Sequence, residues 1–114
     1  MTYPTFFHRM PLADLPVTTA EARMVASDDA LVIFFDFKEE TVIPPHAHGA
    51  QWGVVIEGSF ELTVGGETRT VGPGDTYDIP PGVEHSARVP AGVRLIDVFE
   101  EAGRYKPRAG PGGS

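Results

Sequence analysis

The segment Pro45–Gln51 reads Pro-His-Ala-His-Gly-Ala-Gln and places two histidines one residue apart where the chain enters a predicted strand. Because side chains alternate between the two faces of a strand, His46 and His48 project to the same face, roughly 7 Å apart. Two imidazoles on one face supply half of a metal site. A third histidine, His85, closely follows the turn Pro80-Pro81-Gly82. We therefore expect the fold to bring His85 beside the histidine pair.

Short strands separated by turns run on both sides of this segment. The expected strands are residues 22–26, 31–37, 41–43, 52–58, 60–64, 67–71, 76–79, 85–89 and 93–100. Turn residues recur every eight to twelve positions, and Gly65-Gly66 is a strong hairpin signal because both residues can adopt positive φ. With no helical stretch, this pattern predicts an all-β fold, a double-stranded β-helix or jelly-roll barrel.

The 114 residues are expected to form one domain with two appendages. Residues 1–21 contain three prolines and several large apolar side chains, so they should form an N-terminal arm that packs on the barrel or on a second subunit. Residues 22–102 should form the barrel. Residues 103–114 hold four glycines, two prolines and no apolar pattern, which predicts a disordered tail.

Composition excludes several classes of protein. The chain has no cysteine, so any transition metal must be bound by nitrogen and oxygen ligands. A net charge of -7 argues against a general nucleic-acid binder. No segment approaches the roughly 20 apolar residues of a membrane helix, and the N-terminus does not resemble a secretory signal. We therefore expect no nucleic-acid or membrane partner and a cytoplasmic location.

The strand at residues 31–37, Leu-Val-Ile-Phe-Phe-Asp-Phe, is apolar on both faces. In an antiparallel protein one face of such a strand lies on the core, and the other still needs a cover. The simplest cover is a second copy of the chain, which predicts a homodimer.

The two histidine segments together resemble the cupin family. The first cupin motif pairs two histidines one residue apart with a following Glu and Gly, and it corresponds here to His46, His48, Gln51 and Gly58. The second motif, Gly-x5-Pro-x-Gly-x2-His-x3-Asn, is matched completely from Gly74 through His85, but its final Asn corresponds to Val89. This chain departs from the first motif because Gln51 replaces Glu and only two residues separate it from His48.

The resemblance implies that His46, His48, Gln51 and His85 bind one divalent transition metal, which is Mn, Fe, Ni or Zn. Given the shorter spacing, either a bulge brings Gln51 to the metal or water takes its position. A neutral Gln leaves the metal its full +2 charge, so we expect it to attract a small anionic substrate, such as a carboxylate or enolate. Three nitrogens and one oxygen leave room for substrate, which is the pattern of a catalytic site.

Three further residues are candidates on the inner face of the barrel. Asp97 shares a strand face with Leu95 and Phe99, so its carboxyl is either a catalytic acid or base or a structural hydrogen-bonding group. Tyr77 and Phe99 are candidate substrate contacts, with core packing as the alternative for Tyr77. Trp52 should face away from the site, toward packing or a dimer contact.

Three functions remain open at this stage. The first is a metal-dependent enzyme that isomerises or opens a sugar acid, because residues 95–99 look like the segment that carries the catalytic aspartate in cupins that open unsaturated uronic acids. The second is a non-haem Fe(II) dioxygenase. The third is a small-ligand-binding cupin without turnover, since one fold hosts many functions.

Overall fold

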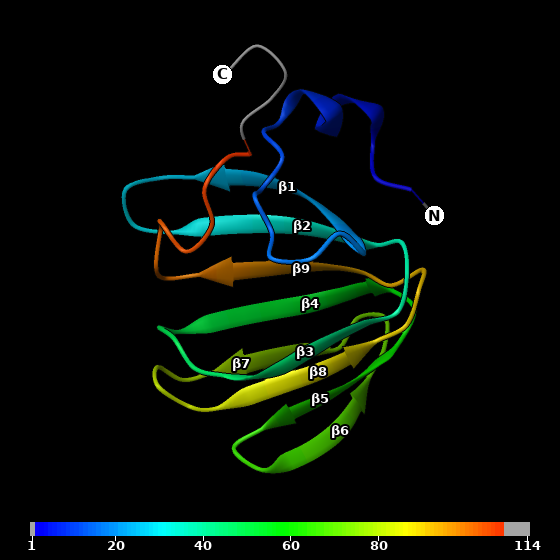
Figure 1. Ribbon diagram of the computed structural model, residues 1–114, viewed down its shortest axis with the longest axis vertical. Coiled ribbons are helices and arrows are strands. Elements are labelled where there is room, and N and C mark those ends of the chain that lie inside the picture. The colour runs from blue at the N-terminus through cyan, green and yellow to red at the C-terminus, as the bar shows by residue number, and fades with distance from the viewer. Residues whose placement is uncertain (1, 109–114) are drawn as a thin grey trace.

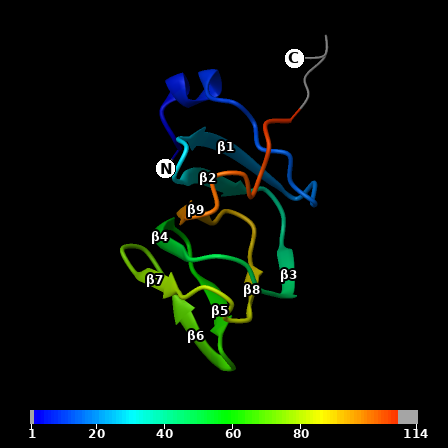
Figure 2. The ribbon, with the colours of Figure 1, turned by 90° about the vertical axis from the view of Figure 1, so that its left-hand side faces the viewer.

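Two antiparallel sheets face each other in this protein, for which a computed structural model describes residues 2–108 (Figures 1 and 2). The described part of the chain comprises, in order, η1 (Thr5–Arg9), β1 (Ala20–Ala26), β2 (Leu31–Phe37), β3 (Thr41–His46), β4 (Gln51–Glu57), β5 (Phe60–Val64), β6 (Glu67–Val71), β7 (Thr76–Ile79), β8 (His85–Val89) and β9 (Arg94–Phe99). One sheet has the order β1-β2-β9-β4-β7 and the other β3-β8-β5-β6. Strands remote in sequence are therefore neighbours, as the predicted jelly roll requires.

The strands form where alternating apolar residues predicted them. In β2 every second side chain is buried, and β9 alternates in the same way, with Leu95, Asp97 and Phe99 directed inward. The hairpin between β5 and β6 turns at Gly65 and Gly66, whose φ angles of 57° and 87° lie in the region that favours glycine. The core lies between the two sheets, as Figure 2 shows edge-on.

The order of the strands brings distant segments of sequence to one end of the barrel. β3 pairs with β8 so that His46 is opposite His85. β4 lies between β7 and β9, and Gly53 on β4 is aligned with Tyr77 on one side and Asp97 on the other. The residues singled out from the sequence therefore share the interior of the barrel.

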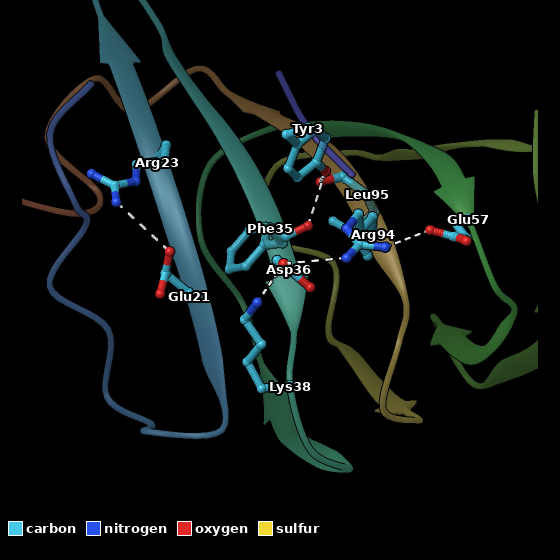
Figure 3. A network of polar contacts seen from close by, with 9 residues as sticks. All are labelled: Tyr3, Glu21, Arg23, Phe35, Asp36, Lys38, Glu57, Arg94 and Leu95. Atoms are coloured by element: carbon cyan, nitrogen blue, oxygen red, sulfur yellow. Dashed lines mark hydrogen bonds and ion pairs between the residues drawn. The ribbon is translucent and has the colours of Figure 1, made fainter. Parts of the chain in front are cut away.

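The first part of the N-terminal arm packs on the outer face of the larger sheet, whereas residues 11–13 pair with the edge of β1 (Figure 1). Tyr3 and Phe7 make edge contacts with Phe34, at centroid distances of 6.1 and 4.8 Å. The Tyr3 hydroxyl also donates to the backbone carbonyls of Phe35 and Leu95 on the two strands beneath it (Figure 3). Part of the cover that β2 needs therefore comes from the chain itself.

Charged side chains surround this contact. Arg94 pairs with Asp36 and Glu57, and Lys38 also pairs with Asp36 (Figure 3). Arg23 donates to the backbone carbonyls of His8 and Met10, at 3.1 and 2.9 Å, and so holds the end of η1. The arm is thus fixed by hydrogen bonds as well as by aromatic packing.

The segment after β9 differs from the expected disordered tail. The backbone N–H of Asp14 donates to the carbonyl of Lys106, and that of Arg108 donates to Leu12, so residues 106–108 pair with the arm. The remainder of the expected tail, residues 109–114, lies outside the described residues. Residues 103–108 have a defined conformation because the arm offers hydrogen-bond partners to their backbone. The amino-acid composition alone did not reveal these partners.

Across residues 2–108, no helix has the length and apolar character needed to cross a membrane.

Candidate active site

Three histidines converge at one end of the barrel. His46 ends β3, His48 lies in the connection to β4, and His85 begins β8. Each offers a ring nitrogen, and the three nitrogens lie within 4.8 Å of one another. Pairing of β3 with β8 sets His46 opposite His85. His48, two residues after His46, also directs its ring toward these two histidines. The fold thus brings together the three residues expected from the sequence.

The backbone fixes the orientation of all three rings. Nδ1 lies 2.9 Å from the carbonyl of Pro44 in His46, 2.8 Å from that of Gly49 in His48 and 2.9 Å from that of Val83 in His85. A carbonyl only accepts, so Nδ1 carries the proton in each neutral ring and Nε2 keeps its lone pair. Such hydrogen bonds orient histidine ligands in metal sites.

The three rings fit a divalent metal. Nε2 of His48 lies 3.1 Å from Nε2 of His85, so two lone pairs face each other unless a cation lies between them. Burial lowers the pKa of both His48 and His85, which keeps the rings neutral, as metal ligands must be. The nitrogen separation is compatible with metal–nitrogen bonds of about 2.0–2.1 Å.

Asp97 lies deeper in the same barrel and is bound by Tyr77. The Tyr77 hydroxyl donates to Oδ1 of Asp97 at 2.5 Å. The Tyr77 ring passes directly over Gly53. A Cβ at position 53 would lie only 2.2 Å from that ring. Glycine in the middle of β4 is therefore a requirement of the Tyr77–Asp97 contact. The contact spans three adjacent strands, β7, β4 and β9.

The Asp97 carboxyl titrates far from its usual range. Burial raises its pKa to about 7, although hydrogen bonds from Tyr77 and Gln51 act in the opposite direction. Burial also holds the pKa of Tyr77 well above its usual range, so Tyr77 remains a donor at neutral pH. A carboxyl with a pKa near 7 can both take up and release a proton at neutral pH.

Gln51 connects the three histidines with the Tyr77–Asp97 pair. It begins β4, is buried, and shares a hydrogen bond with Asp97. When its amide N–H₂ donates to the carboxylate, its oxygen is left for a second partner. Its expected role as the fourth metal ligand stays a prediction, as does the catalytic role of Asp97.

A cavity of about 70 Å³ joins these residues. Its polar lining includes the three histidines, Gln51, Tyr77 and Asp97, and its remaining walls are largely apolar. Phe99 lies 5.6 Å from the His48 ring and lines the same cavity. All of the site residues expected from the sequence therefore share one space, whereas Trp52 projects away from it and is 42% exposed.

The sequence did not identify Tyr105, which lines this cavity, or Arg104 beside it. The Arg104 guanidinium lies over the rings of Phe99 and Tyr105, at 5.8 and 5.1 Å, and its charge helps to lower the pKa of His48 and His85. Its buried Nε has no hydrogen-bond partner. Both residues fall in the expected tail, where only an aromatic residue beside a cation in a polar segment gave any signal.

Two carboxylates hold the histidine loop in place. Oε1 of Glu101 accepts from the N–H of Gly49 at 2.7 Å, and Oε1 of Glu100 accepts from Ala50 at 3.0 Å. Glu101 also lies 3.9 Å from Nδ1 of His48. The segment that follows β9 therefore supports the metal-binding end of the barrel from outside.

The family comparison agrees with this geometry. The Cupin domain model matches residues 33–99, which is more than half of the chain, so this protein belongs to the cupin family. No match was found among curated proteins.

Solved structures of cupins are similar over most of this chain. An RmlC-like cupin from Shewanella frigidimarina is 26% identical with a TM-score of 0.77, and the match covers 91% of this chain and 95% of that one. KdgF from Halomonas sp. is 28% identical with a TM-score of 0.71, and the match covers 89% of each chain. A Bacillus subtilis oxalate decarboxylase variant, 24% identical with a TM-score of 0.69, shares the fold over 82% of this chain and 28% of its own.

The histidine geometry predicts one bound metal per chain. Protein purified without a histidine tag and incubated with Mn²⁺, Fe²⁺, Ni²⁺ or Zn²⁺ should take up one equivalent of at least one of them. His48→Ala and His85→Ala should each weaken binding by roughly 100-fold or more, because each removes a ligand. His8→Ala, which alters an exposed histidine of the arm, is the matched control. Metal analysis that finds near-zero uptake by the unmutated protein would contradict the prediction.

The raised pKa of Asp97 predicts a stability change with pH. Its carboxyl binds a proton more tightly when folded, so its contribution to stability is lost as pH rises from about 4 to about 7. The Asp97→Asn variant has no carboxyl at this position, so its stability does not decrease in this way as the pH rises. In metal-free protein, its free energy of unfolding relative to the unmutated chain should therefore rise over that range, by at most about 4 kcal/mol.

Urea unfolding at a series of pH values measures this difference, and the histidines cancel because both proteins contain them. Asp28→Asn, at an exposed turn residue, should follow the unmutated protein at every pH. A difference between Asp97→Asn and the unmutated protein that does not change with pH would show that Asp97 stays charged in the folded state.

Proposed function

We propose that this cupin is a metal-dependent enzyme that isomerises or opens a small sugar acid by acid–base catalysis. The observation that carries the proposal is the shared cavity, in which a buried carboxyl with a pKa of about 7 lies beside three converging imidazoles. Perturbed carboxyls in a pocket are characteristic of catalytic sites.

His46, His48 and His85 would hold the metal, with Gln51 as the fourth ligand. The metal, when bound, supplies a Lewis acid that polarises a substrate oxygen. Because none of these four ligands is charged when the rings are neutral, the site favours an anionic substrate. The neutral rings and the backbone hydrogen bonds at each Nδ1 support this assignment.

Asp97 would move the proton. In ring opening, its carboxylate accepts the proton of the anomeric hydroxyl while the bond from the anomeric carbon to the ring oxygen breaks. In a 4,5-unsaturated uronate the ring oxygen then becomes an enolate oxygen. The enolate takes the proton held by Asp97 at carbon 4, so the C4–C5 double bond becomes a single bond and carbon 5 becomes a ketone. Proton and electron pair both stay within the substrate, so the change is an isomerisation. Tyr77 remains protonated and keeps the carboxyl in position.

Arg104 would bind the carboxylate of the substrate. Its guanidinium lies over Phe99, which lines the histidine cavity, and its charge helps to lower the pKa of His85. Arginine is suited to carboxylates because its planar donors match both oxygens. An anion between the metal and Arg104 would thus have cations on two sides.

The sequence resemblance of residues 95–99 to uronate ring-opening cupins favours this substrate class. The test is turnover of a 4,5-unsaturated galacturonate by protein loaded with each of the four metals, followed by loss of the ultraviolet absorbance of its double bond. Asp97→Asn should reduce the rate by roughly 100-fold or more with unchanged metal content. Asp78→Asn, an exposed aspartate on β7, is the matched control.

Other results would replace this proposal. Oxygen uptake that occurs only with Fe²⁺ would identify a dioxygenase. Saturable binding of the uronate without turnover by any metal form would identify a binding protein. Equal rates for Asp97→Asn and the unmutated protein would remove Asp97 from the mechanism.

We also propose that two copies of this protein associate through the outer face of the larger sheet, and that the protein is cytoplasmic. One row of aligned side chains crosses four strands of this face, from Val25 through Val32 and Val98 to Trp52. Val25 is 49% exposed and Trp52 is 42% exposed, so the arm leaves this row uncovered. A two-fold contact would cover the same row on both copies.

Sedimentation should therefore give the mass of two chains. Trp52→Glu and Val25→Glu should each shift the protein toward the mass of one chain, because each places a charge in the apolar row. Val42→Glu is the control, because Val42 is 62% exposed and lies on the other sheet. A single-chain mass for the unmutated protein at all concentrations would exclude the dimer.

A further inference from the structure

A second cavity lies behind the one that contains the histidines. It has a volume of about 100 Å³ and is lined by the arm, β1, β2, β3 and the segment after β9. Its lining is almost entirely apolar and includes Leu15, Pro16, Val17 and Ala20 from the arm side. None of the residues proposed to bind metal or move protons lines it. The proposed reaction therefore leaves this space without a use.

Four residues line both cavities and so form the wall between them. They are Phe35, Phe37, Ile43 and Tyr105. The first two belong to β2, which is paired on both sides, by β1 and by β9. Ile43 belongs to β3 and pairs with Ala87 of β8. These three side chains are attached to backbone that the sheets hold in place.

Tyr105 is held differently. It lies outside any strand, and its ring is fixed by an edge contact with Phe99 at 5.7 Å and by its neighbour Arg104. Its hydroxyl also shares a hydrogen bond with the Arg104 side chain. Lys106 beside it pairs with the arm, but Tyr105 itself lies in no strand, so its side chain can turn with less rearrangement than the side chains on β2 and β3. Tyr105 is therefore the partition that decides whether the two cavities are separate or joined.

The histidine cavity alone holds only part of a metabolite. Its volume of about 70 Å³ compares with roughly 300–1,000 Å³ for the pockets that bind typical small-molecule ligands. We propose that Tyr105 bounds the site on the side of the second cavity: the unmutated protein excludes acids whose apolar group would extend into that cavity, and removal of the Tyr105 ring admits them. This inference rests on the proposed binding of an anion at the metal.

Two 2-oxo acids with the same head group provide the test. Pyruvate and phenylpyruvate present the same carboxylate and ketone to the metal and to Arg104, but phenylpyruvate also carries an apolar ring, which the second cavity would accept once the partition opens. Titration calorimetry with metal-loaded protein measures both affinities. Tyr105→Ala should raise the ratio of phenylpyruvate to pyruvate affinity by roughly 10-fold or more. Tyr105→Phe retains the ring and should keep the ratio of the unmutated protein.

Tyr105→Leu serves as a second variant of intermediate size if Tyr105→Ala melts below the assay temperature, and it should raise the ratio by a smaller amount. An unchanged ratio in a folded variant that still binds pyruvate would overturn the role of Tyr105 alone. Failure of pyruvate to bind to the unmutated protein and to the variants would overturn both this inference and the proposed anion site. A larger ratio in Tyr105→Phe would show that the hydroxyl, not the ring, sets the limit.

Discussion

The pairing of β3 with β8 is the constraint on which the site depends. It sets His46 opposite His85, two residues that are far apart in sequence, and it fixes both backbones within one sheet. The ring orientation then follows from short-range contacts, because each Nδ1 meets a backbone carbonyl one or two residues away. The sheet therefore sets the positions of the ligands, and the local turns set the direction of their lone pairs.

In the other sheet, the contact between Asp97 and Tyr77 depends on the residue that lies between them. Asp97 on β9 reaches Tyr77 on β7 although a whole strand lies between them, and this is possible only because β4 has a glycine at position 53. The hydrogen bond holds one oxygen of a carboxyl whose ionisation burial disfavours. Gln51 on the same strand bonds to the same carboxyl and adjoins the histidines, so β4 connects the metal end with the proton-transfer end.

The sequence predicted much of this arrangement because its signals are local. Alternation of apolar residues and the turn glycines identified the strands, and two histidine motifs identified the three histidines that converge in the barrel. The alternation in β9 also placed Asp97 on the inner face. What it missed depends on contacts between distant segments. The arm was expected on the barrel or on a second subunit, and only the fold shows Tyr3 and Phe7 against Phe34. The second subunit predicted from the outer face of β2 stays a prediction. Composition predicted a disordered tail, but Arg104 and Tyr105 lie against Phe99.

Burial of the charged Asp97 carboxylate destabilises the folded protein, and this energetic cost bears on the role of Asp97. A carboxyl that served only to accept the Tyr77 hydrogen bond would be served as well by the neutral oxygen of an asparagine, without the charge that burial disfavours. Two groups that stabilise the carboxylate, Tyr77 and Gln51, are present and still leave the pKa near 7. The barrel thus holds Asp97 where either protonation state is accessible at neutral pH, which is the property that acid–base catalysis requires and that structural packing does not.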